Sequence, residues 1–199
     1  KEAQDALDQL YENSSRMLTI VNDLLNVSRI NQGRAREDAV SLDVEKLLDE
    51  VLATMHGAIE EKGLKLNIHR PKEKLPALFM TKQHLFEAIE NLVANAARYN
   101  RDKGSINVGL SREGGDVVLT IADTGIGIPE VDQKKIFSKF FRAANAVQHF
   151  TDGSGLGLSV VKSYIEENGG SVSFVSKQDV GTTFTVRLPV EPKKPVILS

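Results

Sequence analysis

Two glycine-rich segments are the parts of this sequence with the most evident chemical use. Asp123 is followed by Gly125 and Gly127 in the run DTGIGIP, and the run GSGLGL covers residues 153–158. A carboxylate at the end of a strand can accept a hydrogen bond from the amino group of an adenine ring, and glycine lets the backbone approach a ligand closely. A plain Asp–Gly turn is the alternative, so the adenine interpretation depends on the surrounding residues.

The second glycine-rich run precedes a helix that we expect over residues 156–168. Unpaired N–H groups at a helix N-terminus bind phosphate well. The spacing is neither that of a Walker A loop nor G-x-G-x-x-G, so a flexible turn explains the run alone equally well. Its position after an irregular stretch, about 127 to 154, favours a movable cover over a nucleotide, which we call the lid.

Asn91 and Asn95 lie one helical turn apart, on one face of a predicted helix. Amide oxygens are hard ligands that suit Mg²⁺, an ion that also bridges phosphates. A solvated helix face is the commoner explanation of such a pair. Here, however, the asparagines border the apolar stripe of Ile89, Leu92 and Val93, where polar side chains need partners. The pair is therefore a candidate metal site.

Basic and aromatic side chains beside these segments are candidate contacts to a nucleotide. Arg98 follows the asparagine helix and Arg142 follows three phenylalanines, so both could contact phosphates, although a single arginine is more often a surface charge. Tyr99 could stack on an adenine ring or fill the core.

The composition argues against several other classes of protein. The 199 residues contain 25 Lys and Arg against 27 Asp and Glu, and the net charge of −2 does not favour a general nucleic-acid or membrane-surface binder. The absence of cysteine excludes disulfides and thiolate metal sites. No apolar run is long enough to predict a transmembrane helix. The sequence begins without methionine and inside a helical pattern, so we expect a fragment of a longer protein.

Apolar periodicity predicts the elements that position these residues. Residues 1 to about 31 show the spacing of a coiled-coil-like helix, followed by a polar linker. Two more helices are predicted before and through the asparagine pair, and alternating residues predict two hairpins, 106–121 and 172–188. Hairpins without a regular βαβ repeat favour an α+β fold, a two-layer α/β sandwich in which a mixed sheet carries helices on one face.

The order of the motifs resembles that of sensor histidine kinases, members of the ATPase superfamily shared with gyrase, heat-shock protein 90 and MutL. The resemblance implies the Bergerat fold and a catalytic ATP-binding domain over residues 38–190. It also implies that residues 1–33 are part of a dimerisation and phosphotransfer hairpin, with a tail at 191–199. The N, G1, F, G2 and G3 boxes correspond in order to Asn91…Asn95, Asp123-x-Gly-x-Gly, Phe137-x-x-Phe140-x-Arg142, Gly153-x-Gly-x-Gly and Gly181-Thr182.

By this resemblance, catalysis involves Asn91, Asn95, Arg98 and Arg142. Asn95 would hold Mg²⁺ with Asn91 beside it, and the two arginines would contact phosphates. Asn91 stands where the ATP-hydrolysing relatives have a glutamate base, so phosphoryl transfer would be preferred over hydrolysis. Catalysis in this class of kinases depends on positioning the reacting groups and neutralising their charge, rather than on a nucleophile in the domain.

The resemblance also implies the contacts to the base. Asp123 would bind the adenine amino group, Thr182 would support Asp123 through water, and Tyr99 would pack on the ring. Phe137 and Phe140 would anchor the lid, and Phe140 is itself among the implied nucleotide contacts. The remaining implied contacts are Gly125, Gly127, Ile128, Gly153, Gly155, Leu156, Gly157 and Leu158.

These expectations describe the ATP-binding part of a two-component sensor histidine kinase, an enzyme that transfers the γ-phosphoryl group of Mg-ATP to a histidine. None of the four histidines has the phosphoacceptor context, so we expect that histidine upstream of Lys1. The implied partners are ATP or ADP, a response regulator receiver domain and a second copy bound through the N-terminal helix, without nucleic-acid or membrane contact by this part. The implied location is cytoplasmic, including the cytoplasmic part of a membrane-bound sensor. A degenerate nucleotide-sensing or dimerisation module, and an ATPase or serine kinase of the same superfamily, stay open as alternatives.

Overall fold

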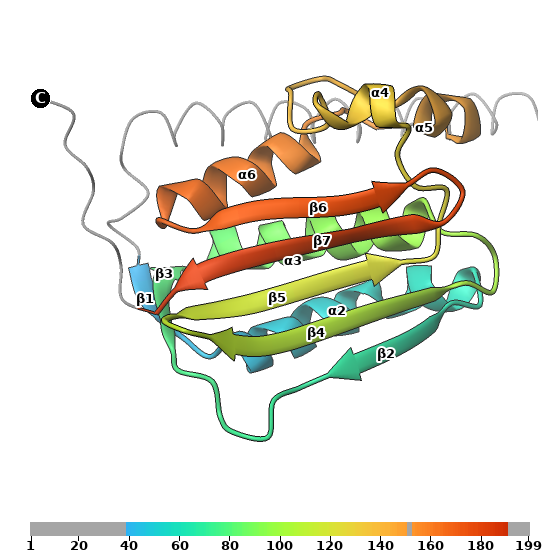
Figure 1. Cartoon of the computed structure of the whole chain (residues 1–199). Coiled ribbons are helices and arrows are strands. Elements are labelled where there is room, and N and C mark those ends of the chain that lie inside the picture. Colours follow the sequence, from blue (N-terminus) through green and yellow to red (C-terminus); the bar gives the residue numbers. More distant parts are fainter. Residues whose placement is uncertain (1–38, 151–152, 191–199) are drawn as a thin grey trace, which may run out of the picture.

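The computed structural model describes residues 39–150 and 153–190, which form two layers, with a sheet on one side and helices on the other (Figure 1). The predicted coiled-coil-like helix, its linker and the C-terminal tail lie outside the described residues. Within the described part, no helix is long and apolar enough to cross a membrane.

The described part of the chain mixes helices and strands without a regular βαβ repeat. The order is β1 (Ala39–Leu42), α2 (Val44–Glu61), β2 (Lys65–His69), β3 (Leu78–Thr81), α3 (Lys82–Arg98), β4 (Ser105–Glu113), β5 (Asp116–Asp123), α4 (Glu130–Gln133), α5 (Ala144–His149), α6 (Gly157–Glu167), β6 (Ser171–Lys177) and β7 (Gly181–Pro189). The predicted helices and hairpins in this part are confirmed. The short helices α4 and α5 lie in the stretch predicted to be irregular, and β3 was not predicted.

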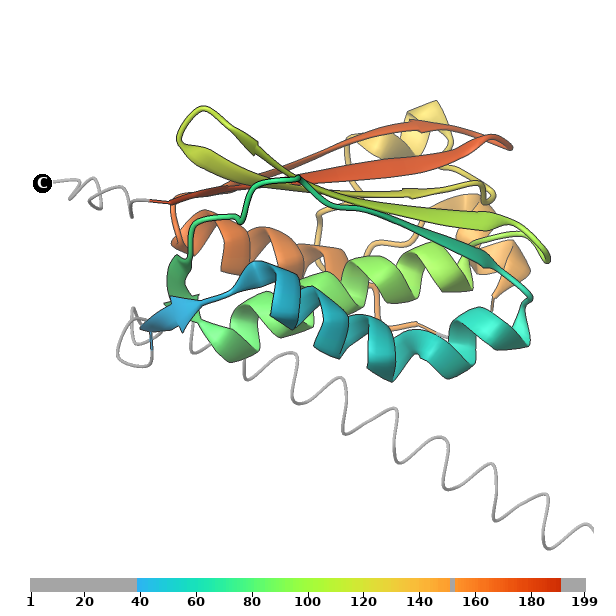
Figure 2. The same cartoon turned by 90° about the horizontal axis from the view of Figure 1, so that it is seen from below.

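The main sheet is mixed, as predicted, with the strand order β2-β4-β5-β7-β6. β2 pairs with β4 in parallel, and the other neighbours are antiparallel. β1 and β3 form a separate antiparallel pair. Figure 2 shows α2, α3 and α6 together on one face of the main sheet, which is the predicted sandwich.

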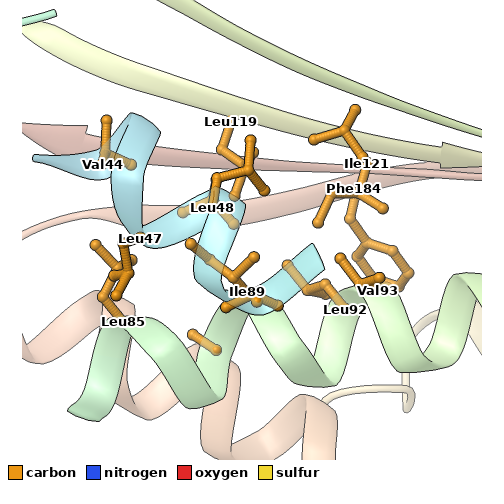
Figure 3. Packing of buried hydrophobic residues seen from close by; sticks show 14 of the residues in the cluster. Val44, Leu47, Leu48, Leu85, Ile89, Leu92, Val93, Leu119, Ile121 and Phe184 are labelled. Carbon is orange, nitrogen blue, oxygen red and sulfur yellow. The ribbon is translucent and has the colours of Figure 1, made fainter. Parts of the chain in front are cut away.

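The core lies between these helices and the sheet. α2 begins at Asp43, whose carboxylate accepts the backbone N–H of Glu45 at 3.2 Å and thereby caps the helix. The apolar stripes of α2 and α3 then face strands β5 and β7, where their residues interdigitate (Figure 3). Burying this surface fixes where α3 and β5 end, and both end at the side of the sheet where α4 and α5 lie (Figure 1).

Candidate functional site

The C-terminal ends of α3 and β5 meet and form the centre of the site. The backbone N–H of Ile126 donates to the carbonyl of Tyr99 at 3.0 Å. A Cβ on Gly125 would lie 2.2 Å from the same carbonyl oxygen, so only glycine lets the two segments approach this closely. The run that follows Asp123 is therefore held directly against the end of α3.

Asp123 lies at the end of β5 with its carboxylate partly fixed by the backbone. Its Oδ1 accepts the N–H of Gly125 at 2.8 Å and that of Thr182 at 3.3 Å. Burial raises the pKa of Asp123 to about 6, and these two hydrogen bonds offset the shift only in part. Within the described residues, Oδ2 accepts no hydrogen bond, so it can accept one from the amino group of a ligand.

Thr182, whose N–H bonds Asp123, is also linked through Ser176 to the run that follows Asp123. Thr182 is buried, and its Oγ1 lies 2.8 Å from Ser176 Oγ. The same Ser176 oxygen accepts the N–H of Ile128 at 2.9 Å. Sequence reasoning missed Ser176, although the register of the last hairpin pairs it directly with Thr182.

The two predicted metal-site asparagines are both half-buried on α3. Asn91 donates from Nδ2 to the carbonyl of Glu87 at 2.8 Å, and its Oδ1 lies beside Gly157, where a Cβ would be only 2.5 Å away. Asn95 makes no side-chain hydrogen bond to another described residue. Its amide oxygen is therefore available to a ligand, and the fold brings Asn91 to the start of α6.

The second glycine-rich run lies against the residues of the F box. Gly153 lies beside the Arg142 guanidinium, and Gly155 packs on the backbone of Phe140. Leu156 is fully buried, backbone included, so no part of this residue is open to a nucleotide in this structure. Leu158 is half-buried and packs against the core, and its contact with a nucleotide stays a prediction.

The expected role of Phe140 as a lid anchor is wrong in this structure. The residue is 58% exposed, and its backbone has a positive φ of 62°. Phe141 and Phe137 pack against the core instead, and the Phe137 ring lies 5.9 Å from that of Phe174. The F box therefore fixes the lid through its flanking phenylalanines.

The lid is also fastened by Asn145, a residue that the sequence did not single out. Asn145 is buried on α5, and its Nδ2 donates to the carbonyl of Gly127 at 2.9 Å. Arg142 donates from Nη2 to the carbonyls of Phe150 at 2.6 Å and Ala146 at 3.4 Å. The lid thus contacts the run after Asp123, and its arginine holds the end of α5.

A hydrogen-bond network around the buried Asn100 joins the ends of three elements. Asn100 donates from Nδ2 to the carbonyl of Ser105 at 3.0 Å and accepts from Thr124 Oγ1 at 3.1 Å. Thr124 Oγ1 in turn accepts the N–H of Ser105 at 2.9 Å. The network connects the end of α3 with the start of β4 and the end of β5, which holds Tyr99 and Asp123 in a fixed relation.

Lys62, at the end of α2, holds the end of α3 from the other side. Its Nζ donates to the carbonyls of Arg98, Ala97 at 3.2 Å and Asn100 at 3.4 Å. Removal from water lowers the pKa of Lys62, although Asp102 opposes this shift. A cation at these carbonyls also stabilises the negative end of the α3 dipole. No local pattern marks Lys62, since only the packing of α2 on α3 creates the contact.

Replacing Lys62 with methionine should lower the free energy of unfolding by roughly 1–2 kcal/mol, because three carbonyls would lose a charged donor. Urea unfolding followed by circular dichroism measures the change. Lys65→Met, at an exposed position of β2, is the matched control and should change stability by less than about 0.5 kcal/mol. Equal unfolding midpoints for the two variants would contradict the role of Lys62.

Comparison with known proteins gives consistent matches. Residues 80–192 match the family model described as histidine kinase-, DNA gyrase B- and HSP90-like ATPase. The chain is 28% identical to the signal transduction histidine-protein kinase BarA of Escherichia coli (strain K12), over 98% of the chain and 22% of BarA. It is also 28% identical to the sensor-like histidine kinase SenX3 of Mycolicibacterium smegmatis, over 93% of the chain and 48% of SenX3. The chain thus spans less than half the length of these relatives.

Solved structures share the same arrangement of elements. Full-length ShkA in complex with AMPPNP superposes with a TM-score of 0.79 at 27% identity, covering 98% of this chain and 40% of ShkA. The histidine kinase ThkA in complex with the response regulator protein TrrA gives a TM-score of 0.74 at 22% identity, covering 97% of this chain and 53% of that chain. The latter similarity shows the fold alone.

Proposed function

Since the chain belongs to the family of histidine kinase-, DNA gyrase B- and HSP90-like ATPases, we propose that it binds Mg-ATP around Asp123 and transfers the γ-phosphoryl group to a histidine outside these 199 residues. The part of sensor histidine kinases to which it corresponds is their catalytic ATP-binding domain. The relative ShkA has been solved with AMPPNP, an analogue of ATP.

The observation that carries the proposal is the hydrogen bonding and burial of the Asp123 carboxylate. Its Oδ1 is held by the N–H groups of Gly125 and Thr182, while Oδ2 remains open at a half-buried position. A carboxylate kept out of water with one open acceptor is suited to a neutral donor such as the amino group of adenine. The carbonyl of Tyr99 accepts the N–H of Ile126 in the run after Asp123, and its aromatic ring would pack on the base.

The phosphates of the nucleotide would lie toward Asn95 and the start of α6. Arg98 follows Asn95 on α3, and Arg142 lies beside Gly153 in the second glycine-rich run. α6 begins at Gly157 without a side-chain cap, so its first N–H groups are available to phosphate oxygens. These cations and N–H groups would neutralise the charge that builds up on the transferred phosphoryl group.

The residues present fit a bound Mg²⁺. The amide oxygens of Asn95 and Asn91 are hard ligands, and Asn95 is committed to no hydrogen bond within the described residues. In this part of the chain, no group of three His, Cys, Asp or Glu could hold a metal ion, so phosphate and water oxygens would complete the coordination. When bound, Mg²⁺ would neutralise negative charge on the phosphates.

Phosphoryl transfer would then depend on how the site positions the γ-phosphoryl group. Asn91 cannot act as a general base, because an amide does not take up a proton near neutral pH, so water in the site is poorly activated. Asn95, Arg98 and Arg142 would orient the γ-phosphoryl group in line with an incoming imidazole nitrogen. A histidine on another segment or another copy could then attack, and ADP would leave.

The partners of the whole protein are also part of the proposal. ThkA has been solved with a response regulator protein, and a receiver domain of that kind would take the phosphoryl group from the histidine. The predicted helix over residues 1–31 would pair two copies and present the phosphoacceptor to the site. The protein would act in the cytoplasm, free or attached to a membrane-bound sensor.

Incubating this chain with ATP labelled at the γ-phosphate and a separate hairpin that carries the phosphoacceptor histidine should label the hairpin with acid-labile phosphate. Asn95→Ala should reduce the transfer rate roughly 10- to 100-fold, the usual cost of weakening a metal site, while the unfolding midpoint changes little. The matched control is Asn67→Ala, since this asparagine lies on β2 and its side chain hydrogen-bonds only Asn107 among the described residues. Nucleotide binding without any labelling would favour a degenerate nucleotide-sensing module.

A further inference from the structure

One lid residue, Phe150, contacts several of the residues assigned above to the nucleotide. Its ring packs edge-to-face on Tyr99, with centroids 5.3 Å apart and an interplanar angle of 83°. The Arg98 guanidinium carbon lies 5.7 Å from the Phe150 centroid, and Lys62 Nζ lies 5.0 Å from it. Phe150 therefore sits where the predicted base-stacking ring and a predicted phosphate contact converge.

The backbone of Phe150 engages the second predicted phosphate contact. Arg142 donates from Nη2 to the Phe150 carbonyl at 2.6 Å, which is the shorter of its two bonds to the end of α5. The Phe150 N–H donates to Ala146 at 3.0 Å, so this carbonyl is fixed by α5. Arg98 and Tyr99 end α3 whereas Arg142 lies in the lid, yet all three contact this one residue.

From this convergence we propose that Phe150 is an autoinhibitory residue that occupies the nucleotide-binding groups and must leave them when ATP binds. The proposal rests on the proposed function of the site. A base stacked on Tyr99 would compete with the Phe150 ring for that side chain. Phosphates would compete with the ring face for Arg98 and with the Phe150 carbonyl for the Nη2 group of Arg142.

The contact lowers the apparent affinity for nucleotide. The molecule divides between a form with Phe150 in place and a form with the site open, and only the open form binds. The measured dissociation constant is then the intrinsic one divided by the open fraction. Because an aromatic pair and a cation–π pair contribute together, we expect the ring to hold the site closed in most molecules.

Phe150→Ala should therefore bind Mg-ADP more tightly, with a dissociation constant roughly three- to tenfold lower than that of the unmodified chain by calorimetry. The matched control is Val147→Ala, because Val147 lies on α5, the helix that ends just before Phe150, and is 50% exposed. The control should bind as the unmodified chain does. Unchanged or weaker binding by Phe150→Ala would overturn the proposal.

A second measurement follows the ring itself. The chain contains no tryptophan, so Phe150→Trp introduces the sole indole fluorophore. On addition of Mg-ADP its emission should shift to longer wavelength, because the ring leaves Tyr99 for water. An unchanged spectrum at a nucleotide concentration that calorimetry shows to be saturating would equally overturn the proposal.

The two measurements separate this proposal from the proposed function. If neither the unmodified chain nor any variant binds Mg-ADP, the function itself fails. If the unmodified chain binds and Phe150→Ala binds no better, only the autoinhibitory contact fails. An equal gain in affinity by Val147→Ala would show general loosening of the lid, which also contradicts a specific role of Phe150.

Discussion

Asp123→Asn should weaken binding of Mg-ADP by roughly 100- to 1,000-fold and, at neutral pH, make the nucleotide-free chain more stable. Asparagine can keep the two bonds that Asp123 Oδ1 accepts from Gly125 and Thr182. Its amide nitrogen would then replace Oδ2, so a donor would face the donating amino group of adenine. The loss of a charge-assisted acceptor and the clash of two donors act in the same direction.

The gain in stability follows from the raised pKa of Asp123. Burial shifts this pKa from 3.8 to about 6, so the folded state holds the proton more tightly than the unfolded chain does. The stabilisation by protonation is fully present below the unfolded pKa and is lost as pH rises to about 6. Above that pH, keeping the carboxylate charged costs about 1–3 kcal/mol, which the neutral asparagine avoids.

Urea unfolding at pH 4 and pH 7.5 tests this sign directly. The difference in free energy of unfolding between Asp123→Asn and the unmodified chain should be largest at pH 7.5 and small at pH 4. Asp116→Asn, at the other end of the same strand, is the control and should leave Mg-ADP binding unchanged. If Asp123→Asn destabilises the chain equally at both pH values, burial of the charged Asp123 carboxylate does not lower the free energy of unfolding. A variant that still binds Mg-ADP normally would remove Asp123 from the adenine site.

The fold was predictable from the sequence wherever one element carries its own pattern. The stripe on α3 and the alternation in β4 are local features, because one face of each element is buried on the core. β3 has only four residues, too few for a clear period, and α5 is a six-residue helix in a stretch without periodicity. The parallel pairing of β2 with β4 depends on packing between distant segments, which no local pattern encodes.

The site was predictable in its motif residues and not in its supporting ones. The order of the glycine-rich runs and of Asn91 and Asn95 indicated which segments should meet, and the structure brings them together. Lys62, Asn145 and Phe150 reach the site only because α2 and α5 pack beside the end of α3, so their sequence neighbours give no signal. Phe140 was predicted from its place in the F box to anchor the lid, but it is exposed. Its place in the motif therefore did not determine which of the three phenylalanines packs on the core.

Gly181→Ala should lower the free energy of unfolding by roughly 3–5 kcal/mol and abolish nucleotide binding by the molecules that remain folded. Gly181 is buried at the start of β7 with φ of +137°, and a Cβ there would lie 2.0 Å from the carbonyl oxygen of Asp123. The strand cannot withdraw without breaking the bond from Thr182 N–H to the Asp123 carboxylate. The clash of a Cβ at position 181 would therefore displace Asp123, the residue predicted to contact adenine.

Gly114→Ala provides the matched control for this prediction. Gly114 also has a positive φ, +60°, but a Cβ there would meet nothing within 4 Å. Its substitution should cost only about 1–2 kcal/mol from the left-handed backbone and leave Mg-ADP binding intact. Both variants place alanine at a positive φ, so this backbone cost is common to them. The difference between their urea midpoints then reports the steric clash between β7 and Asp123. Equal midpoints, or a Gly181→Ala chain that binds Mg-ADP as the unmodified chain does, would show that this approach neither limits stability nor positions the carboxylate.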